Sequence, residues 1–112
     1  MLPQEFRLTK RRDFSRVYAR GKAIACKDFV MYRCKRRGGA VRIGFSSSKK
    51  LGGAVQRNRA RRVFRHAAAG ILDKFPAGAD YVFIIRASGA VKTAPQIQRS
   101  ILRQLTEGES GR

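Results

Sequence analysis

The sequence has little negative charge and few of the side chains that bind metals. Only 7 Asp and Glu accompany 26 Lys and Arg among 112 residues, giving a formal net charge of +19. With one His and two Cys, Cys26 and Cys34, a zinc tetrad of His and Cys ligands is excluded. The scattered carboxylates offer no acid pair for hydrolysis by the protein itself. We therefore expect no catalytic residue and no metal site on this chain.

Long apolar runs are also missing. No stretch approaches the roughly 20 apolar residues that a membrane-spanning helix needs. The apolar stretch at the start of the chain is too short for a signal peptide, because the charged residues Lys10 to Arg12 soon follow it. We expect a cytoplasmic protein with reduced thiols and with no membrane partner.

Composition predicts one small folded domain. Hydrophobic residues make up 43% of the chain, which is near the globular average and argues against a disordered basic tail. We expect a single domain over residues 1–112, with an arm at 1–8, a polar tail at 107–112 and no obligate protein partner.

The positive charge is concentrated in the middle of the sequence. No acidic residue lies between Asp28 and Asp73, while that stretch holds twelve Lys or Arg. A folded domain with such a basic patch favours a nucleic acid as its partner.

A helical pattern with a basic face follows the turn at Gly52 and Gly53. At about 100° per residue, one side of this helix collects small and apolar residues and the other collects Arg. Like-charge pairs at i,i+4 cost roughly 0.2–0.5 kcal/mol each, and no acid relieves them here. Arg also matches phosphate oxygens with two parallel hydrogen bonds, so a phosphate backbone is favoured over the alternative of a merely solvated face. The core side holds Ala60, Val63, Phe64, Ala67, Ala68, Ile71 and Phe75, and the polar side holds Asn58, Arg59, Arg61, Arg62, Arg65 and His66, with Arg57 at the border.

The other patterns predict a layered α/β domain with helices packed on a mixed sheet. We expect the strands near 29–36 and 40–45 to pair as an antiparallel hairpin, and the apolar run at 81–85 to be an inner strand. The basic helix then connects the strand at 40–45 to the strand at 81–85. Helices are expected at Lys10 to Arg20, capped by Thr9, and from Pro95 onward, and a further strand at Lys22 to Ala25.

One stretch resembles a known family. Ser48-Lys49-Lys50-Leu51-Gly52-Gly53-Ala54-Val55-Gln56-Arg57-Asn58-Arg59-Ala60-Arg61-Arg62 is similar to the signature of bacterial ribonuclease P protein subunits, an Arg-Asn-Arg helix after a Ser-Lys-Lys-x-Gly-Asn-Ala-Val turn. It departs at Gly53, where the family usually has Asn, and at Arg61, where Lys is common. Residues 8–21, 29–32 and 80–86 resemble other family elements, so the resemblance covers most of the chain.

The resemblance implies both a fold and a function. The fold is an α/β (α+β) sandwich, ordered helix-strand-strand-strand-helix-strand-helix, with a left-handed crossover. The function is that of the accessory protein of an endoribonuclease that removes the 5′ leader of precursor tRNA. Catalysis and Mg²⁺ binding would reside mainly in the RNA subunit, and the partners would be that catalytic RNA and precursor tRNA. The implied contacts to the catalytic RNA are Lys49, Lys50, Arg57, Asn58, Arg59, Arg61, Arg62 and Arg65.

Aromatic residues among basic ones indicate a second RNA surface. Phe14 and Tyr18 lie four residues apart on the first predicted helix, and Tyr32 lies on a strand. Unpaired bases stack on such rings at about 1–3 kcal/mol each, although spacing alone leaves core packing open. The resemblance implies that the leader-binding cleft consists of Phe14, Tyr18, Phe29 and Tyr32.

Two other classes compete with this interpretation. A DNA-binding regulator of the helix-turn-helix kind needs a short helix directly before the basic one, where a strand and a Gly turn are predicted. A noncatalytic RNA-binding protein, such as a small ribosomal protein, would also bind folded RNA through Arg. The motif from Lys49 to Arg62 favours the ribonuclease P subunit over both.

Overall fold

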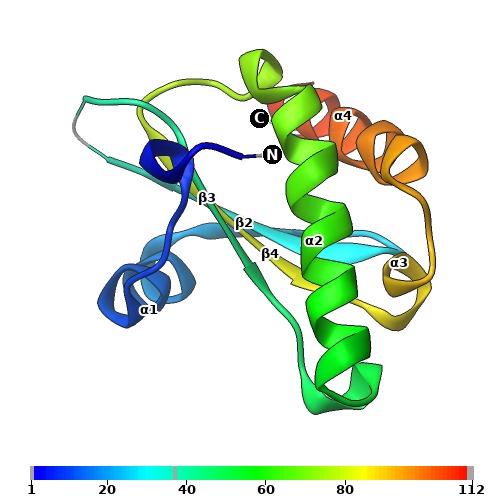
Figure 1. The fold of residues 1–112 in the computed structure, drawn as a ribbon. Coiled ribbons are helices and arrows are strands. Elements are labelled where there is room, and N and C mark those ends of the chain that lie inside the picture. The colour runs from blue at the N-terminus through cyan, green and yellow to red at the C-terminus, as the bar shows by residue number, and fades with distance from the viewer. Residues whose placement is uncertain (1, 37, 111–112) are drawn as a thin grey trace.

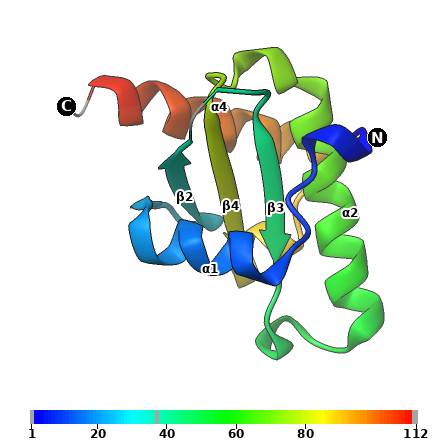
Figure 2. The same ribbon diagram turned by 90° about the vertical axis from the view of Figure 1, so that its left-hand side faces the viewer.

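The computed structural model describes residues 2–36 and 38–110, with side chains as far as residue 106. One mixed sheet of four strands, in the order β1-β2-β4-β3, separates two helical layers (Figure 1). Helix α1 covers one face, and α2 and α4 cover the other (Figure 2). The strands are β1 (Lys22–Ala25), β2 (Phe29–Lys35), β3 (Arg42–Ser46) and β4 (Ala79–Ile85). The helices are α1 (Arg11–Arg20), α2 (Ala54–Gly70), α3 (Ala87–Ala90) and α4 (Ala94–Ser110), with 3-10 turns η1 (Gln4–Phe6), η2 (Lys49–Leu51) and η3 (Leu72–Lys74).

Strand β4 occupies the middle of the sheet. It pairs antiparallel with β2 and parallel with β3, and β2 pairs antiparallel with β1. The inner-strand prediction for residues 81–85 is confirmed, but the predicted hairpin between β2 and β3 is wrong. The apolar side chains of β4 need cover on both faces and β4 gains a partner at each edge, so it lies between the two strands that are neighbours in sequence.

The connection from β3 through α2 to β4 has an unusual hand. In Figure 2, α1 lies before the sheet and α2 behind it, while β3 lies to the right of β4 and both strands run downward. A chain that follows this path makes a left-handed crossover, although such parallel connections are nearly always right-handed. The expected left-handed crossover is therefore confirmed.

The larger core lies between the sheet and the layer of α2 and α4. Phe29, Phe64, Phe83, Ile97 and Ile101 are fully buried there. α4 begins at Ala94, next to the predicted Pro95, and no helix within the described residues is long and apolar enough to cross a membrane.

The first residues of the chain pack against the sheet. Leu2 is fully buried in the larger core, and the amide of Leu8 donates to the carbonyl of Ile43, so residues 2–8 of the predicted arm pack against β3. Helix α1 has Lys10 as its N-cap residue and no side-chain cap, so Thr9 is not the cap. The predicted tail is helical through Ser110, and residues 111–112 lie outside the described part.

Candidate nucleic-acid interface

Helix α2 presents the predicted basic face. Its apolar stripe is buried, with Ala60, Phe64 and Ala67 at most 1% exposed, which turns the opposite side towards solvent. Gly53 is the N-cap residue and provides no side-chain cap, in contrast to the Asn usual at this position in the resembling family. Among the predicted RNA contacts, Lys49 and Lys50 on η2 and Asn58, Arg59 and Arg62 on α2 are exposed, and Arg57, Arg61 and Arg65 on α2 are half-buried.

Arg61 is held in place by polar neighbours. Its guanidinium donates to the hydroxyl of Ser47, in the segment after β3, and to the side-chain oxygen of Asn58 one turn earlier. These hydrogen bonds order the side chain before any ligand arrives, so binding costs less rotamer entropy.

Arg65 lies in a cluster of positive charge formed with Arg7, Arg61 and Arg62. Burial, and then the charges of Arg7, Arg61 and Arg62, lower its pKa below the ordinary Arg value. Arg stays protonated at neutral pH despite such a shift. The charged form is therefore disfavoured by its surroundings, and a bound anion would relieve that penalty.

On the opposite face of the sheet, α1 is fixed by a buried carboxylate. Asp80 on β4 is fully buried and accepts hydrogen bonds from Arg36 at 2.8 Å, from Arg42 at 2.8 Å and from Arg16 of α1. Asp13 of α1 lies 3.4 Å from the guanidinium of Arg16 and 3.6 Å from that of Arg42. These ion pairs join α1 to β3, to β4 and to Arg36, the residue after β2, and set its position over the sheet.

The aromatic rings of α1 and β2 form a contiguous group on this face. The ring centroids of Tyr18 and Tyr32 lie 5.1 Å apart in an edge-on contact, and those of Phe14 and Tyr18 lie 6.3 Å apart. Tyr18 is 38% exposed, while Phe14 and Tyr32 are half-buried against a small core that includes Val17 and Val82. The rings thus serve partly as core and partly as accessible surface.

Phe29 does not belong to this group. It is fully buried in the larger core, where its ring centroid lies 6.1 Å from that of Phe64 and 5.1 Å from that of Phe83. Side chains alternate along a strand, so Phe29 and Tyr32, three residues apart, point to opposite faces. Its assignment to the leader-binding cleft is corrected accordingly.

The aromatic group and the Arg face meet in one groove of about 540 Å³. Phe14 and Tyr18 line one side and Arg61 and Arg65 the other. The sequence patterns indicate two separate surfaces and assign no role to the polar residues between them. The one feature of the sequence that could have pointed to these polar residues is the run of three serines that directly follows a predicted strand. The remaining lining residues are Leu8, Thr9, Arg11, Phe45, Ser46 and Ser47.

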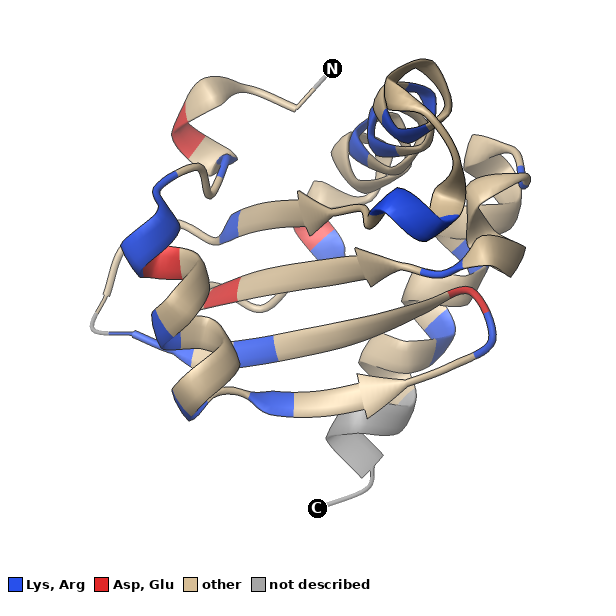
Figure 3. Ribbon diagram, turned by 90° about the horizontal axis from the view of Figure 1, so that it is seen from below, with Lys and Arg blue, Asp and Glu red and all other residues tan. Residues whose placement is uncertain are grey.

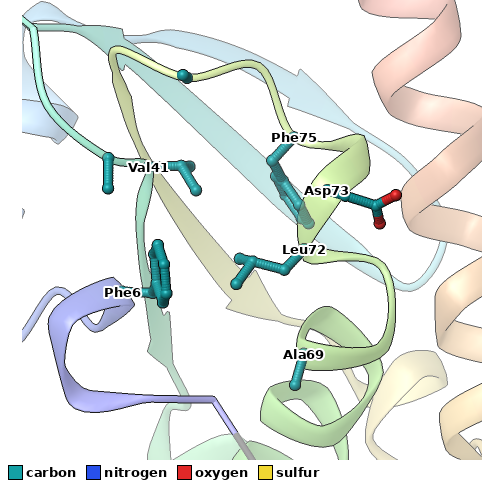
Figure 4. A pocket seen from close by; sticks show the side chains of 8 residues that line it. Phe6, Val41, Ala69, Leu72, Asp73 and Phe75 are labelled. Atoms are coloured by element: carbon teal, nitrogen blue, oxygen red, sulfur yellow. The ribbon is translucent and has the colours of Figure 1, made fainter.

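A second hollow, on the side of α2 and η3, has a different character. Figure 4 shows Phe6, Val41, Leu72 and Phe75 pointing into it, and none of the described residues that line it is basic. A hollow without cations has nothing to pair with phosphate, so we do not assign it to nucleic acid.

A small α/β domain with an Arg-rich helix beside an aromatic groove belongs to the class of single-domain nucleic-acid-binding proteins. Residues 2–108 match the family model described as Ribonuclease P. The chain is 41% identical over 105 residues to the ribonuclease P protein component of Pelotomaculum thermopropionicum, with 94% of each chain covered. This chain belongs to the ribonuclease P protein family, as its central motif predicted.

Solved structures agree with this membership and with the predicted fold class. The RNase P protein of Staphylococcus aureus is 33% identical with a TM-score of 0.77, over 92% of this chain and 94% of that one. The RNase P protein from Thermotoga maritima is 27% identical with a TM-score of 0.79, over 88% and 94%. The alternatives of a small ribosomal protein and a DNA-binding regulator find no support in these matches.

Proposed function

We propose that this chain is the protein subunit of ribonuclease P, binding the catalytic RNA through η2 and α2 and the 5′ leader of precursor tRNA in the groove. The observation that carries the proposal is the shared groove, which is lined by the aromatic residues Phe14 and Tyr18 together with Arg61 and Arg65. Rings bind unpaired bases and arginines bind phosphates, so the groove suits a single strand of any sequence. The subunit would thereby promote 5′ maturation of tRNA in the cytoplasm, where its free thiols stay reduced.

Catalysis, in this proposal, belongs to the RNA subunit together with its Mg²⁺. Magnesium sites use carboxylate oxygens that are free to bind metal. Here Asp13, Asp28 and Asp80 are engaged in ion pairs with Arg or Lys side chains. The exposed Glu5 and Asp73 lie on separate elements, η1 and η3. The protein's role is then to bind and orient RNA.

The basic face is tested by removing charge from α2. Replacing Arg61, Arg62 and Arg65 with Ala should weaken binding of the catalytic RNA and flatten its log-log salt dependence by about 0.7–0.9 for each phosphate that is no longer bound. A matched control replaces the exposed Lys74, Arg99 and Arg103 with Ala. An unchanged salt slope in the first variant would mean that this face is only solvated.

The meeting of the two surfaces is tested by single variants of neighbouring arginines. Arg65 lines the groove, whereas Arg62 is exposed outside it. Arg65→Ala should lower the affinity for leader-bearing tRNA as well as for catalytic RNA, while Arg62→Ala should affect the catalytic RNA alone. If the two variants lose affinity for the same RNAs to the same extent, then the groove and the Arg face do not act together in binding the leader.

Leader recognition is tested on the rings. Replacing Tyr18 and Tyr32 with Leu keeps bulk but removes the stacking surface, worth about 1–3 kcal/mol per base. We expect the assembled RNA–protein complex to lose affinity for precursor tRNA and to keep its affinity for tRNA without a leader. Equal losses of affinity for both RNAs, or a lower melting temperature that accounts for the losses, would mean that these rings serve only in core packing.

A further inference from the structure

A hollow lined mainly by basic residues lies at the C-terminal end of α1, where β1 begins beside the end of β2. It has a volume of about 440 Å³ and is lined by Arg20, Lys22, Arg33, Cys34 and Lys35. Figure 3 shows Lys and Arg at the end of α1 and at the adjoining ends of β1 and β2. None of these residues belongs to the groove described above.

The strand register creates this hollow. Lys22, the first residue of β1, pairs with Arg33, so Cys34 and Lys35 extend beyond β1 and leave the edge of β2 uncovered. The tight connection between α1 and β1 requires glycine at position 21, because a Cβ there would lie 2.4 Å from the carbonyl oxygen of Val17 and 3.0 Å from that of Arg33. This close approach brings the end of α1 to the open edge of β2.

The charges around the hollow have no counterions among the residues that line it. Four of these five described residues are Lys or Arg, and none is acidic. The buried or paired acids Asp13, Asp28 and Asp80 contact other cations. In addition, the Nε atom of Arg33 is buried without a hydrogen-bond partner in the described part of the chain. Such an arrangement favours an external anion.

The helix dipole explains only part of this cluster. Cations are favoured at the carboxyl end of a helix, which accounts for Arg20 and contributes at Lys22. Arg33 and Lys35 lie on a strand and receive no such benefit. Their convergence on the same hollow therefore needs another cause.

A chain of side-chain contacts links the hollow to the leader groove. Cys34 lines the hollow and also belongs to the small core against which Tyr32 packs, and Tyr32 contacts Tyr18. A strand that stacks on the two tyrosines would bring its following phosphates to the end of α1. The residues that line the hollow include no aromatic ring, so it would hold the backbone without stacking bases.

From these observations we propose that the hollow binds backbone phosphates of an RNA strand leaving the aromatic groove, which are the leader nucleotides farther from the cleavage site. The inference rests on the proposed function and extends it. It gives the leader path a second, sequence-independent contact region formed by Arg20, Lys22, Arg33 and Lys35.

The test removes three exposed charges from the hollow. One variant combines Arg20→Gln, Lys22→Gln and Lys35→Gln, and leaves the half-buried Arg33 unchanged. A control combines Lys27→Gln, Lys74→Gln and Arg99→Gln, which are exposed, lie outside the groove and the hollow, and remove the same charge. Melting temperatures of both variants are measured first, to establish that each is folded.

Affinities are then measured for the complex of catalytic RNA and protein. The substrates are tRNA without a leader and precursor tRNAs with leaders of about 4 to about 16 nucleotides, the usual range of single-strand site sizes. In the hollow variant, we expect a loss that is absent without a leader and grows beyond a threshold leader length. The salt slope for long leaders should fall by about 0.7 for each phosphate that the hollow no longer binds.

The other outcomes separate the sources of phosphate and the two proposals. A loss confined to binding of the catalytic RNA by the protein supports a phosphate site whose ligand is that RNA, and overturns the leader assignment. Equal behaviour of the hollow and control variants overturns the inference. In that case, a leader preference in the parent complex that disappears in Tyr18→Leu would leave the proposed function standing, whereas a parent complex without any leader preference would refute the proposed function.

Discussion

Asp80 is the residue on which the position of α1 depends most directly. Its carboxylate is fully buried and accepts hydrogen bonds from Arg16, Arg36 and Arg42. Asp80→Asn keeps nearly the same volume but removes the charge, so three guanidinium groups lose their common counterion. The perturbation tests whether this cluster holds the helix that carries the groove.

The expected magnitude follows from the exposure of the arginines. Removing one partner of a buried ion pair costs about 3–5 kcal/mol. The three arginine side chains remain 23–33% exposed, so water screens part of the loss. We therefore expect about 3 kcal/mol, out of the roughly 5–15 kcal/mol typical of a domain. At roughly 4–8 °C per kcal/mol, the melting temperature should fall by roughly 12–24 °C.

Thermal unfolding followed by circular dichroism measures this loss. Asp73→Asn is the control, because Asp73 is exposed and the change in formal charge is the same. Below the transition, Asp80→Asn should weaken leader binding more than catalytic-RNA binding, since Arg16 and Asp13 of α1 lose their anchor. A fall in melting temperature no larger than that of Asp73→Asn would show that the ion pairs do not secure the helix.

Three further variants test other parts of the fold. Burial alone would raise the pKa of Asp28, but hydrogen bonds led by that of Lys92 outweigh it and lower the pKa below 3.8. The ionised carboxylate of Asp28 therefore contributes fully to the free energy of unfolding above its unfolded-state pKa, and this contribution disappears as pH falls through the folded-state pKa. When unfolding is measured as a function of pH, the stability of Asp28→Asn should fall less on acidification than that of the parent. Gly44→Ala would place a Cβ 2.5 Å from the Phe14 ring and displace it, so affinity for leader-bearing tRNA should fall while that for catalytic RNA is kept. Phe29→Leu should destabilise the core, by on the order of 1 kcal/mol in denaturant unfolding, without selective loss of leader binding.

The central helix was predictable because its signal is local. The period of its apolar residues places Ala60, Phe64 and Ala67 on one side, and all three are buried as expected. Its basic face follows from the same geometry. Helix periodicity therefore identified the exposed and buried sides of α2 without knowledge of its neighbours.

The pairing of the strands was harder to predict from the sequence, because it depends on segments that are far apart in the chain. β2 and β3 are joined by a short turn, which favours a hairpin when local closure is considered alone. β4 follows them by more than thirty residues, yet it lies between them because it buries apolar side chains on both faces. Similarly, the buried acids Asp28 and Asp80 carry no sequence signal, since their partners come from remote elements.

The candidate site illustrates the same division between local and distant information. Alternation along β2 separates Phe29 from Tyr32, whereas the family resemblance, which covers residues 29–32, does not distinguish the two faces. Conversely, no local pattern brings Tyr18 and Arg65 into one groove; their meeting requires α1 on one face of the sheet and α2 on the other face, next to the edge strand β3. Since β3 is the edge strand next to α2, the groove can run from the rings of α1 to the arginines of α2 without crossing another strand. The left-handed crossover places α2 on the face of the sheet opposite α1, so rings from one face and arginines from the other line one groove at the β3 edge.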